Sequence, residues 1–243
     1  MHLSRRNVSS RRLVVSPPCA PHALLMDPPP FAAARVRDDS PRLVERDLAA
    51  RLSFDCPPSL LERLRARYAE PQRRYHTWTH VLACFDARDQ LTSTALPAVD
   101  LALLFHDAVY EPLAADNEGA SAELLLEEGR RASIDDRVLQ RARALVLATK
   151  HHEAGDGGED ACIVLDADLS ILGSESAVFA EYERQVRIEY AQVDDATYAA
   201  ARASILRGIL ARPVLYLTRR GQHLWEANAR ANLAASIRAL TPG

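Results

Sequence analysis

The sequence predicts an all-α fold, and three observations support this prediction. From residue 39 onward, apolar residues recur at spacings of three and four, the period of one helix face. No stretch alternates apolar and polar residues between hairpin turns, so strands are not expected. Proline or acidic residues begin several of the periodic segments, as they do in the first turns of helices. We therefore predict one helical domain over residues 39–243.

Each helix is expected from local signals. The predicted helical segments begin at Ser40, Pro57, His76, Pro97, Asp116 and near Val138, continue with the segment that carries Asp168, and end with residues 179–190, 196–210 and 221–240. Pro97 opens the central helix, and Pro112 lies just past its end. A turn-rich loop at residues 154–158 precedes the segment that carries Asp168.

The first 38 residues differ from the rest. The first 26 contain four arginines and no acidic residue, but their apolar part, residues 13–15, is too short for a secretory signal. Met26, which an aspartate and three prolines follow, offers a later start. We predict that residues 1–38 form a disordered extension, which an over-extended gene start would also explain.

Composition excludes several functions. The 243 residues carry a formal net charge of -3, so no global basic field would recruit nucleic acid. No apolar run approaches the roughly 20 residues that span a bilayer, so no membrane contact is expected. Neither GxxxxGKS/T nor GxGxxG occurs, which disfavours phosphate-loop and dinucleotide-binding folds. The four cysteines are scattered without a CxxC pair, which fits a cytoplasmic protein.

The stretch from Leu101 to Tyr110 is apolar nearly all round, which predicts a buried helix. It nevertheless contains adjacent His106 and Asp107. A buried carboxylate beside an imidazole is costly unless it is paired or bound to a metal. Neighbours on a helix diverge by roughly 100°. The two side chains can still converge on one ion that lies between their directions.

Flanking segments supply further candidate ligands. His76 and His80 are four residues apart and could share one helix face. His80 is the better candidate because its helix is already under way, whereas His76 could cap a helix or lie in a loop. Histidine nitrogen together with carboxylate oxygen suits divalent transition metals.

Asp166 and Asp168 interrupt another apolar stretch. They are separated by roughly 200° around a helix, so both cannot face one ion. The core stripe is Leu165, Leu169 and Leu172, and Asp168 falls inside it. We therefore expect Asp168 to be the ligand and Asp166 to have a helix-start or surface role.

The order His80, His106-Asp107, Asp168 on successive helices resembles the HD-domain superfamily of metal-dependent phosphohydrolases. It is most similar to a bacterial family described only as predicted metal-dependent HD phosphohydrolases, over residues 40–240. The similar motifs are RYHT at 74–77 with His80, FHDAVY at 105–110, DNE at 116–118 with Ser121, ATKHH at 148–152, LDADLSILG at 165–173 and ARANL at 229–233.

The resemblance implies a helical fold with a metal site between its central helices. One divalent ion (Mn, Fe, Ni, Co, Zn or Mg) would be held by His80, His106, Asp107 and Asp168. Water bound to such an ion loses a proton near neutral pH, and the ion polarises a phosphoryl oxygen. The implied reaction is hydrolysis of a phosphate ester or anhydride of a small metabolite, with nucleotides as the favoured class. The substrate, the metal and the oligomeric state stay open.

Other polar residues are candidates to act on the substrate. Those expected to bind its phosphate are Arg74, His76, Lys150, His151 and His152. Besides Asp107, Asp116 and Glu118 could orient water or act as acid or base. A solvated helix terminus explains Asp116 and Glu118 about as well, and Lys150 could merely complement a helix C-terminus.

Two other functions stay open. Some HD-fold proteins hold two irons and activate oxygen, and here only the adjacent His151 and His152 could supply a second ion. The other alternative is a non-catalytic nucleotide- or metal-binding module, against which the intact ligand set argues. Iron content with oxygen uptake would favour the oxygenase, whereas tight nucleotide binding without turnover would favour the module.

Overall fold

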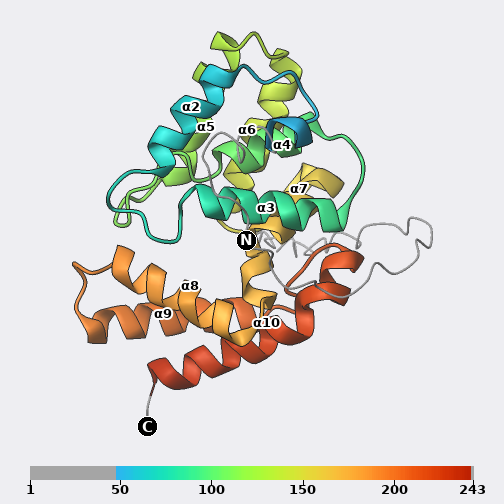
Figure 1. Ribbon diagram of the computed structural model, residues 1–243. Helices are drawn as coiled ribbons and strands as arrows, with labels where there is room; N and C mark the ends of the chain where they lie inside the picture. The colour runs from blue at the N-terminus through green and yellow to red at the C-terminus, as the bar shows by residue number, and fades with distance from the viewer. Residues whose placement is uncertain (1–47, 242–243) are drawn as a thin grey trace, which may run out of the picture.

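The structure is a computed structural model that describes residues 48–241 (Figure 1). After a short helical segment at residues 48–51, its helices are α2 (Pro58–Tyr68), α3 (Trp78–Leu91), α4 (Pro97–Phe105), α5 (Asn117–Arg131), α6 (Asp136–Thr149), α7 (Gly158–Asp168), α8 (Ser176–Glu189), α9 (Asp195–Leu210) and α10 (Arg219–Leu240), with 3-10 turns η1 (Gly155–Gly157) and η2 (Leu169–Gly173). No strand occurs in residues 48–241, so the predicted all-α fold is confirmed.

Two predictions concern residues that precede residue 48. The expected disordered extension at 1–38 and the expected helix start at Ser40 lie outside the described residues. Over residues 48–241, no helix is both long and apolar enough to cross a membrane.

Helix α4 is the centre of the part of the molecule formed by α2–α7 (Figure 1). Every residue from Val99 to Phe105 is buried, as expected for a segment that is apolar nearly all round. Helices α3, α5, α6 and α7 all contact it. Truncating a leucine in such a position to alanine costs about 2–5 kcal/mol of stability. The groups at the end of α4 are therefore held on a rigid support.

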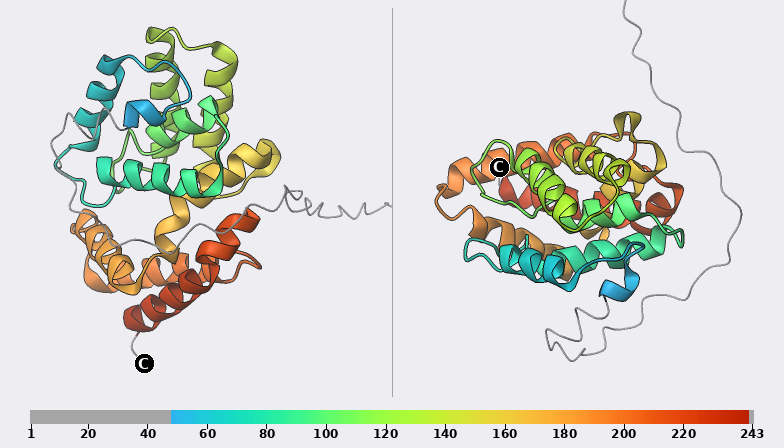
Figure 2. Two further views of the ribbon diagram at one scale, coloured as in Figure 1. Left: turned by 45° about the vertical axis from the view of Figure 1, so that its right-hand side comes forward. Right: turned by 90° about the horizontal axis from the view of Figure 1, so that it is seen from above.

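Helices α8, α9 and α10 form a layer on one side of this core, and the segment from α7 through η2 leads into it (Figure 2, left). Helix α10 packs against α9 and η2. Gly173 at the end of η2 permits this contact, because a Cβ there would lie 2.8 Å from backbone atoms of Trp225. A larger residue would push α10 away.

The central helix is shorter than the sequence predicts. It ends at Phe105, and His106 is its C-cap, so the prediction that it continues to Tyr110 is wrong. The buried guanidinium of Arg73 donates to the carbonyl oxygens of the two residues after His106, at 2.7 and 3.1 Å. These bonds hold the chain in a turn. His106 itself keeps helical φ and ψ of -54° and -36°, so regular helix is lost only in the residues that follow it.

Candidate metal centre

Four side chains meet where α3, α4 and α7 come together. His80 lies in the first turn of α3, His106 caps α4, Asp107 follows, and Asp168 is the last residue of α7. His80 Nε2 is 3.0 Å from His106 Nε2 and 3.2 Å from Asp168 Oδ1. His106 Nε2 is 3.1 Å from Asp107 Oδ2, and the two remaining imidazole–carboxylate distances are both 3.5 Å. The structure thus brings together the four residues that the resemblance implies as ligands.

The orientation of His106 indicates what this cluster can bind. Its Nδ1 lies 3.1 Å from the carbonyl oxygen of Leu103, so Nδ1 donates there and Nε2 is the nitrogen that faces the cluster and is left for a metal. His80 Nε2 and two carboxylate oxygens converge on the same point. Ligand atoms about 2.0–2.2 Å from one ion lie about 3.0–3.5 Å from each other. The spacing and the donor set both fit a divalent ion.

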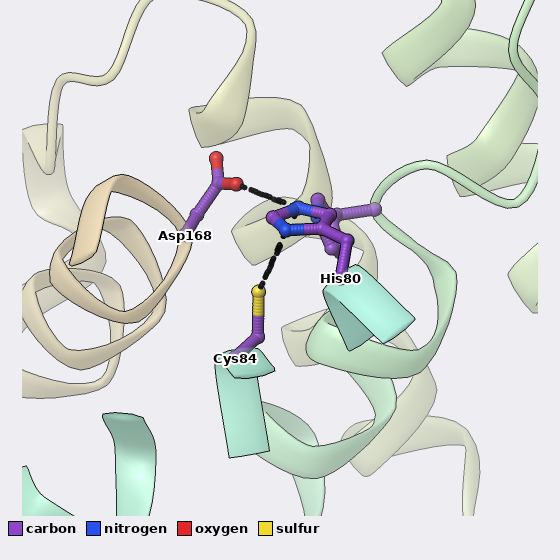
Figure 3. A group of neighbouring side chains, drawn as sticks. His80, Cys84 and Asp168 are labelled. Atoms are coloured by element: carbon purple, nitrogen blue, oxygen red, sulfur yellow. Dashed lines mark hydrogen bonds and ion pairs between the residues drawn. The ribbon is translucent and has the colours of Figure 1, made fainter. Parts of the chain in front are cut away.

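A thiol lies beside this cluster (Figure 3). Cys84 belongs, with His80, His106 and Asp168, to a group whose possible ligand atoms all lie within 4.8 Å of one another. Its Sγ is 3.7 Å from both ring nitrogens of His80, which places the sulfur on the plane midway between them. An ion on Nε2 lies outward from that nitrogen, so the sulfur would be well beyond the roughly 2.3 Å of a metal–thiolate bond. Asp107 is therefore the better fourth ligand.

Electrostatics in the cluster favour ionised carboxylates. Burial raises the pKa of Asp107 and of Asp168, but the neighbouring imidazoles outweigh burial and hold both pKa values well below the usual range. Burial lowers the pKa of His80, so that ring is neutral near pH 7. Burial lowers the pKa of His106 as well, but Asp107 and Asp168 outweigh burial and raise it well above the usual range, so this ring holds a proton that a bound metal would displace. Carboxylates and neutral imidazoles are the protonation states in which these groups bind metals.

The structure distinguishes His152 from His151. His152 Nε2 lies 3.1 Å from Asp168 Oδ2, the oxygen that does not face His80, so this imidazole orients the carboxylate. His152 has a φ of 50°, in the left-handed region that is costly for residues other than glycine. Arg212 stabilises this backbone by donating to the carbonyl oxygens of His151 and His152 at 3.2 and 3.4 Å. The His151 side chain is exposed and makes no hydrogen bond or ion pair within the described chain.

Four other residues predicted to act on the substrate do not contact the cluster directly. Lys150 Nζ and Asp116 Oδ1 form an exposed ion pair at 2.6 Å, next to Glu118 at the start of α5. The Arg74 guanidinium donates to carbonyl oxygens of its own loop. Between residues 48 and 241, none of these four forms a hydrogen bond or ion pair with a cluster side chain. These four residues can therefore act only on a part of the substrate that lies away from the metal-ligand cluster.

His76 lies in the loop before α3, which is one of the two positions left open by the sequence, and it shares no helix face with His80. Its Nδ1 is 2.7 Å from Oε2 of Glu189, a buried residue at the end of α8 that sequence reasoning missed. A signal was present, because Glu189 continues a helical stripe at spacings of three and four. The preceding members of that stripe are Phe179, Tyr182 and Val186. A glutamate in such a position is a charged group on a core face.

Asp166 is not in the cluster, and the expected surface position is wrong. It is buried in the last turn of α7. Its carboxylate accepts the backbone N–H groups of Leu217 and Thr218 and the Thr218 hydroxyl, at 2.7, 2.8 and 2.6 Å. The Thr218 hydroxyl in turn accepts the N–H of Gly221 at the start of α10. Asp166 thus supports the start of α10 from the end of its own helix.

No family model matches the chain, and neither the curated proteins nor the solved structures yield a match. Its class therefore has to be described from the fold and from the candidate site. It is an all-α chain with a buried cluster of two histidines and two aspartates that fits a divalent ion.

Proposed function

We propose that this protein is a metal-dependent phosphohydrolase of the HD type. The observation that carries the proposal is the cluster itself: each Nε2 lies within 3.5 Å of the other and of both carboxylate oxygens. Two nitrogens with two oxygens suit Mn, Fe, Co, Ni or Zn. Magnesium prefers oxygen ligands and is the least suited of the metals considered.

Exposure indicates how a substrate would approach. The side chains of His80 and His106 are only 3% and 2% exposed, whereas those of Asp107 and Asp168 are 19% and 15% exposed. Solvent therefore reaches the cluster from the carboxylate side. The bound metal would polarise a phosphoryl oxygen and acidify water, while His152 keeps Asp168 oriented. The proposed substrate is a small phosphorylated metabolite, with nucleotides favoured, and the proposed location is the cytoplasm.

One ion is favoured over two, which argues against the oxygenase. In the described range only one group of three or more His, Cys, Asp or Glu side chains has the spacing of a metal site. His152 directs Nε2 to Asp168, and His151 is exposed. The adjacent histidines therefore do not form a second pair of converging ligands.

A turnover screen of purified protein tests the proposal. The protein is stripped with a chelator, reloaded with single divalent metals, and assayed on a panel of phosphorylated metabolites with metal content measured by mass spectrometry. We expect hydrolysis only after reloading, at about one ion per chain. His106→Ala should lose the ion, whereas the matched Cys84→Ser should keep it, because Cys84 lies beside the cluster and not in it.

Two results would overturn this function. Oxygen uptake by an iron-loaded protein that is inactive on every phosphorylated compound would identify the oxygenase. Tight nucleotide binding without turnover would identify the binding module.

A further inference from the structure

A second buried polar cluster is built around Glu189, whose side chain is fully shielded from solvent. Its Oε1 accepts three backbone N–H groups, those of residues 74, 75 and 76, at 2.7, 2.8 and 3.0 Å. Its Oε2 lies 2.7 Å from Nδ1 of His76 and 2.9 Å from the hydroxyl of Tyr110. The carboxylate thus ties the end of α8 to the loop that precedes α3.

The direction of each of these hydrogen bonds follows from the charge of Glu189. Burial raises the pKa of Glu189, but the His76 ring and the backbone N–H groups outweigh burial and lower it to about 2. An ionised carboxylate only accepts hydrogen bonds. His76 Nδ1 must therefore carry a proton, and Nε2 of the neutral ring keeps its lone pair.

The other edge of the His76 ring lies beside the metal cluster. The ring stacks on Tyr110 with centroids 4.1 Å apart, and it stands edge-on to His80 at 6.0 Å. Nε2 has no hydrogen-bond partner within residues 48–241, and the side chain is 20% exposed.

We propose that Glu189 is a positioning residue that holds His76 as the Nδ1–H tautomer, so that Nε2 serves as a hydrogen-bond acceptor for water or a substrate hydroxyl beside the metal cluster. The catalytic consequence rests on the proposed hydrolase function, whereas the tautomer itself does not. Through this side chain of α8 the C-terminal layer would contribute to a site whose ligands come from α3, α7 and the two residues that follow α4.

Glu189→Gln is a sharp test because it should reverse one hydrogen bond. Three backbone N–H groups require an oxygen at the Oε1 position, so the amide nitrogen must take the Oε2 position. That nitrogen donates to His76 Nδ1, which moves the ring proton to Nε2. Tyr110→Phe is the matched control, because it removes a donor to the same oxygen but keeps the ring stack and the carboxylate.

The experiment is nitrogen-15 NMR of the imidazoles in zinc-loaded protein at pH 8, with His76 assigned from a His76→Asn spectrum. We expect the Nδ1–H tautomer in wild type and Tyr110→Phe and the Nε2–H tautomer in Glu189→Gln, all with equal zinc content. On any hydrolysed substrate, kcat of Glu189→Gln should fall about 10- to 100-fold, with a smaller loss in Tyr110→Phe.

An Nε2–H tautomer of His76 in the wild-type spectrum would by itself overturn the proposal. This holds even if Glu189→Gln does not fold. Retention of Nδ1–H in folded Glu189→Gln would overturn it as well. Equal losses of kcat in Glu189→Gln and Tyr110→Phe would show that Glu189 has only a structural role. Absence of any hydrolysis would contradict the hydrolase and leave the tautomer result standing.

Discussion

Two aspartates in the last turn of α7 have opposite surroundings. Asp166 receives three hydrogen bonds from neutral donors of the protein, and burial raises its pKa to about 6 despite them. Burial also raises the pKa of Asp168, but hydrogen bonds from three imidazoles hold it well below the usual range. The Asp166 carboxylate finds all of its hydrogen-bond donors within the protein. The Asp168 region instead holds a proton between imidazoles and carboxylates, and a metal cation could replace that proton.

The comparison gives a criterion for separating structural from functional buried carboxylates. A carboxylate whose partners are backbone N–H groups and hydroxyls has its hydrogen-bonding capacity met and acts as a brace. One whose charge is balanced only by imidazoles that can lose their protons offers its oxygens to a metal cation, together with the imidazole nitrogens. Position on the helix alone does not separate them, since the two residues are only two apart.

The largest expected effect is on metal content. Asp168→Asn should lose the bound ion and reduce turnover by at least about 100-fold, because it removes a charged ligand. Asp166→Asn should keep stoichiometric metal. Metal analysis of both purified variants tests this prediction. Loss of metal in Asp166→Asn but not in Asp168→Asn would show that Asp166 is the ligand.

Metal removal should destabilise the protein. At a free metal concentration of 100 times Kd, binding stabilises the folded state by about 2.7 kcal/mol, which corresponds to a Tm shift of about 5–10 °C. A chelator should produce this shift in wild type and in Asp166→Asn but none in Asp168→Asn. Equal shifts in both variants, measured by calorimetry, would mean that the metal binds elsewhere.

Loss of the brace should lower stability without affecting the ion. Asp166→Ala leaves the N–H groups of Leu217 and Thr218 without their acceptor, which costs about 1–3 kcal/mol for a buried group. Urea unfolding of the chelated protein measures this loss. An unchanged midpoint would show that the start of α10 does not depend on Asp166.

Asp166 should also give a distinctive pH dependence. Its folded pKa of about 6 is above the unfolded value of about 3.9, so the folded state binds the proton more tightly. The stability from this proton uptake is fully present below the unfolded pKa and is lost as pH rises through about 6. The stability difference between chelated wild type and Asp166→Asn should therefore shrink from pH 4 to pH 7. A difference that grows over this range would contradict the raised pKa.

The smallest effect concerns the adjacent histidines. His152→Ala should reduce turnover about 10-fold while metal content stays near wild type, because it frees one oxygen of Asp168. His151→Ala should be within about twofold, since its side chain is exposed. Parallel kinetics and metal analysis test both, and loss of metal in His151→Ala would revive the two-metal alternative.

The sequence by itself determined the helical class and most of the helices. Their signals are local, because apolar spacing and first-turn residues act within a few positions of the chain. His106, Asp107 and Asp168 could also be found this way, since a histidine or aspartate inside an apolar run is conspicuous wherever the run folds. His80 was favoured by its place in a helix already under way, and the resemblance joined the four into one set. Glu189 carried the same signal on the stripe of α8, although less clearly in a more polar helix.

Only the tertiary structure decided how these residues are used. Arg73 ends α4 from 34 residues away, Asp166 braces backbone 51 residues further on, and Glu189 reaches His76 across 113 residues. The choice of His152 over its neighbour depends on a left-handed backbone that Arg212 stabilises across 60 residues. Such hydrogen bonds join segments far apart in the chain, and no periodicity within either segment specifies its partner.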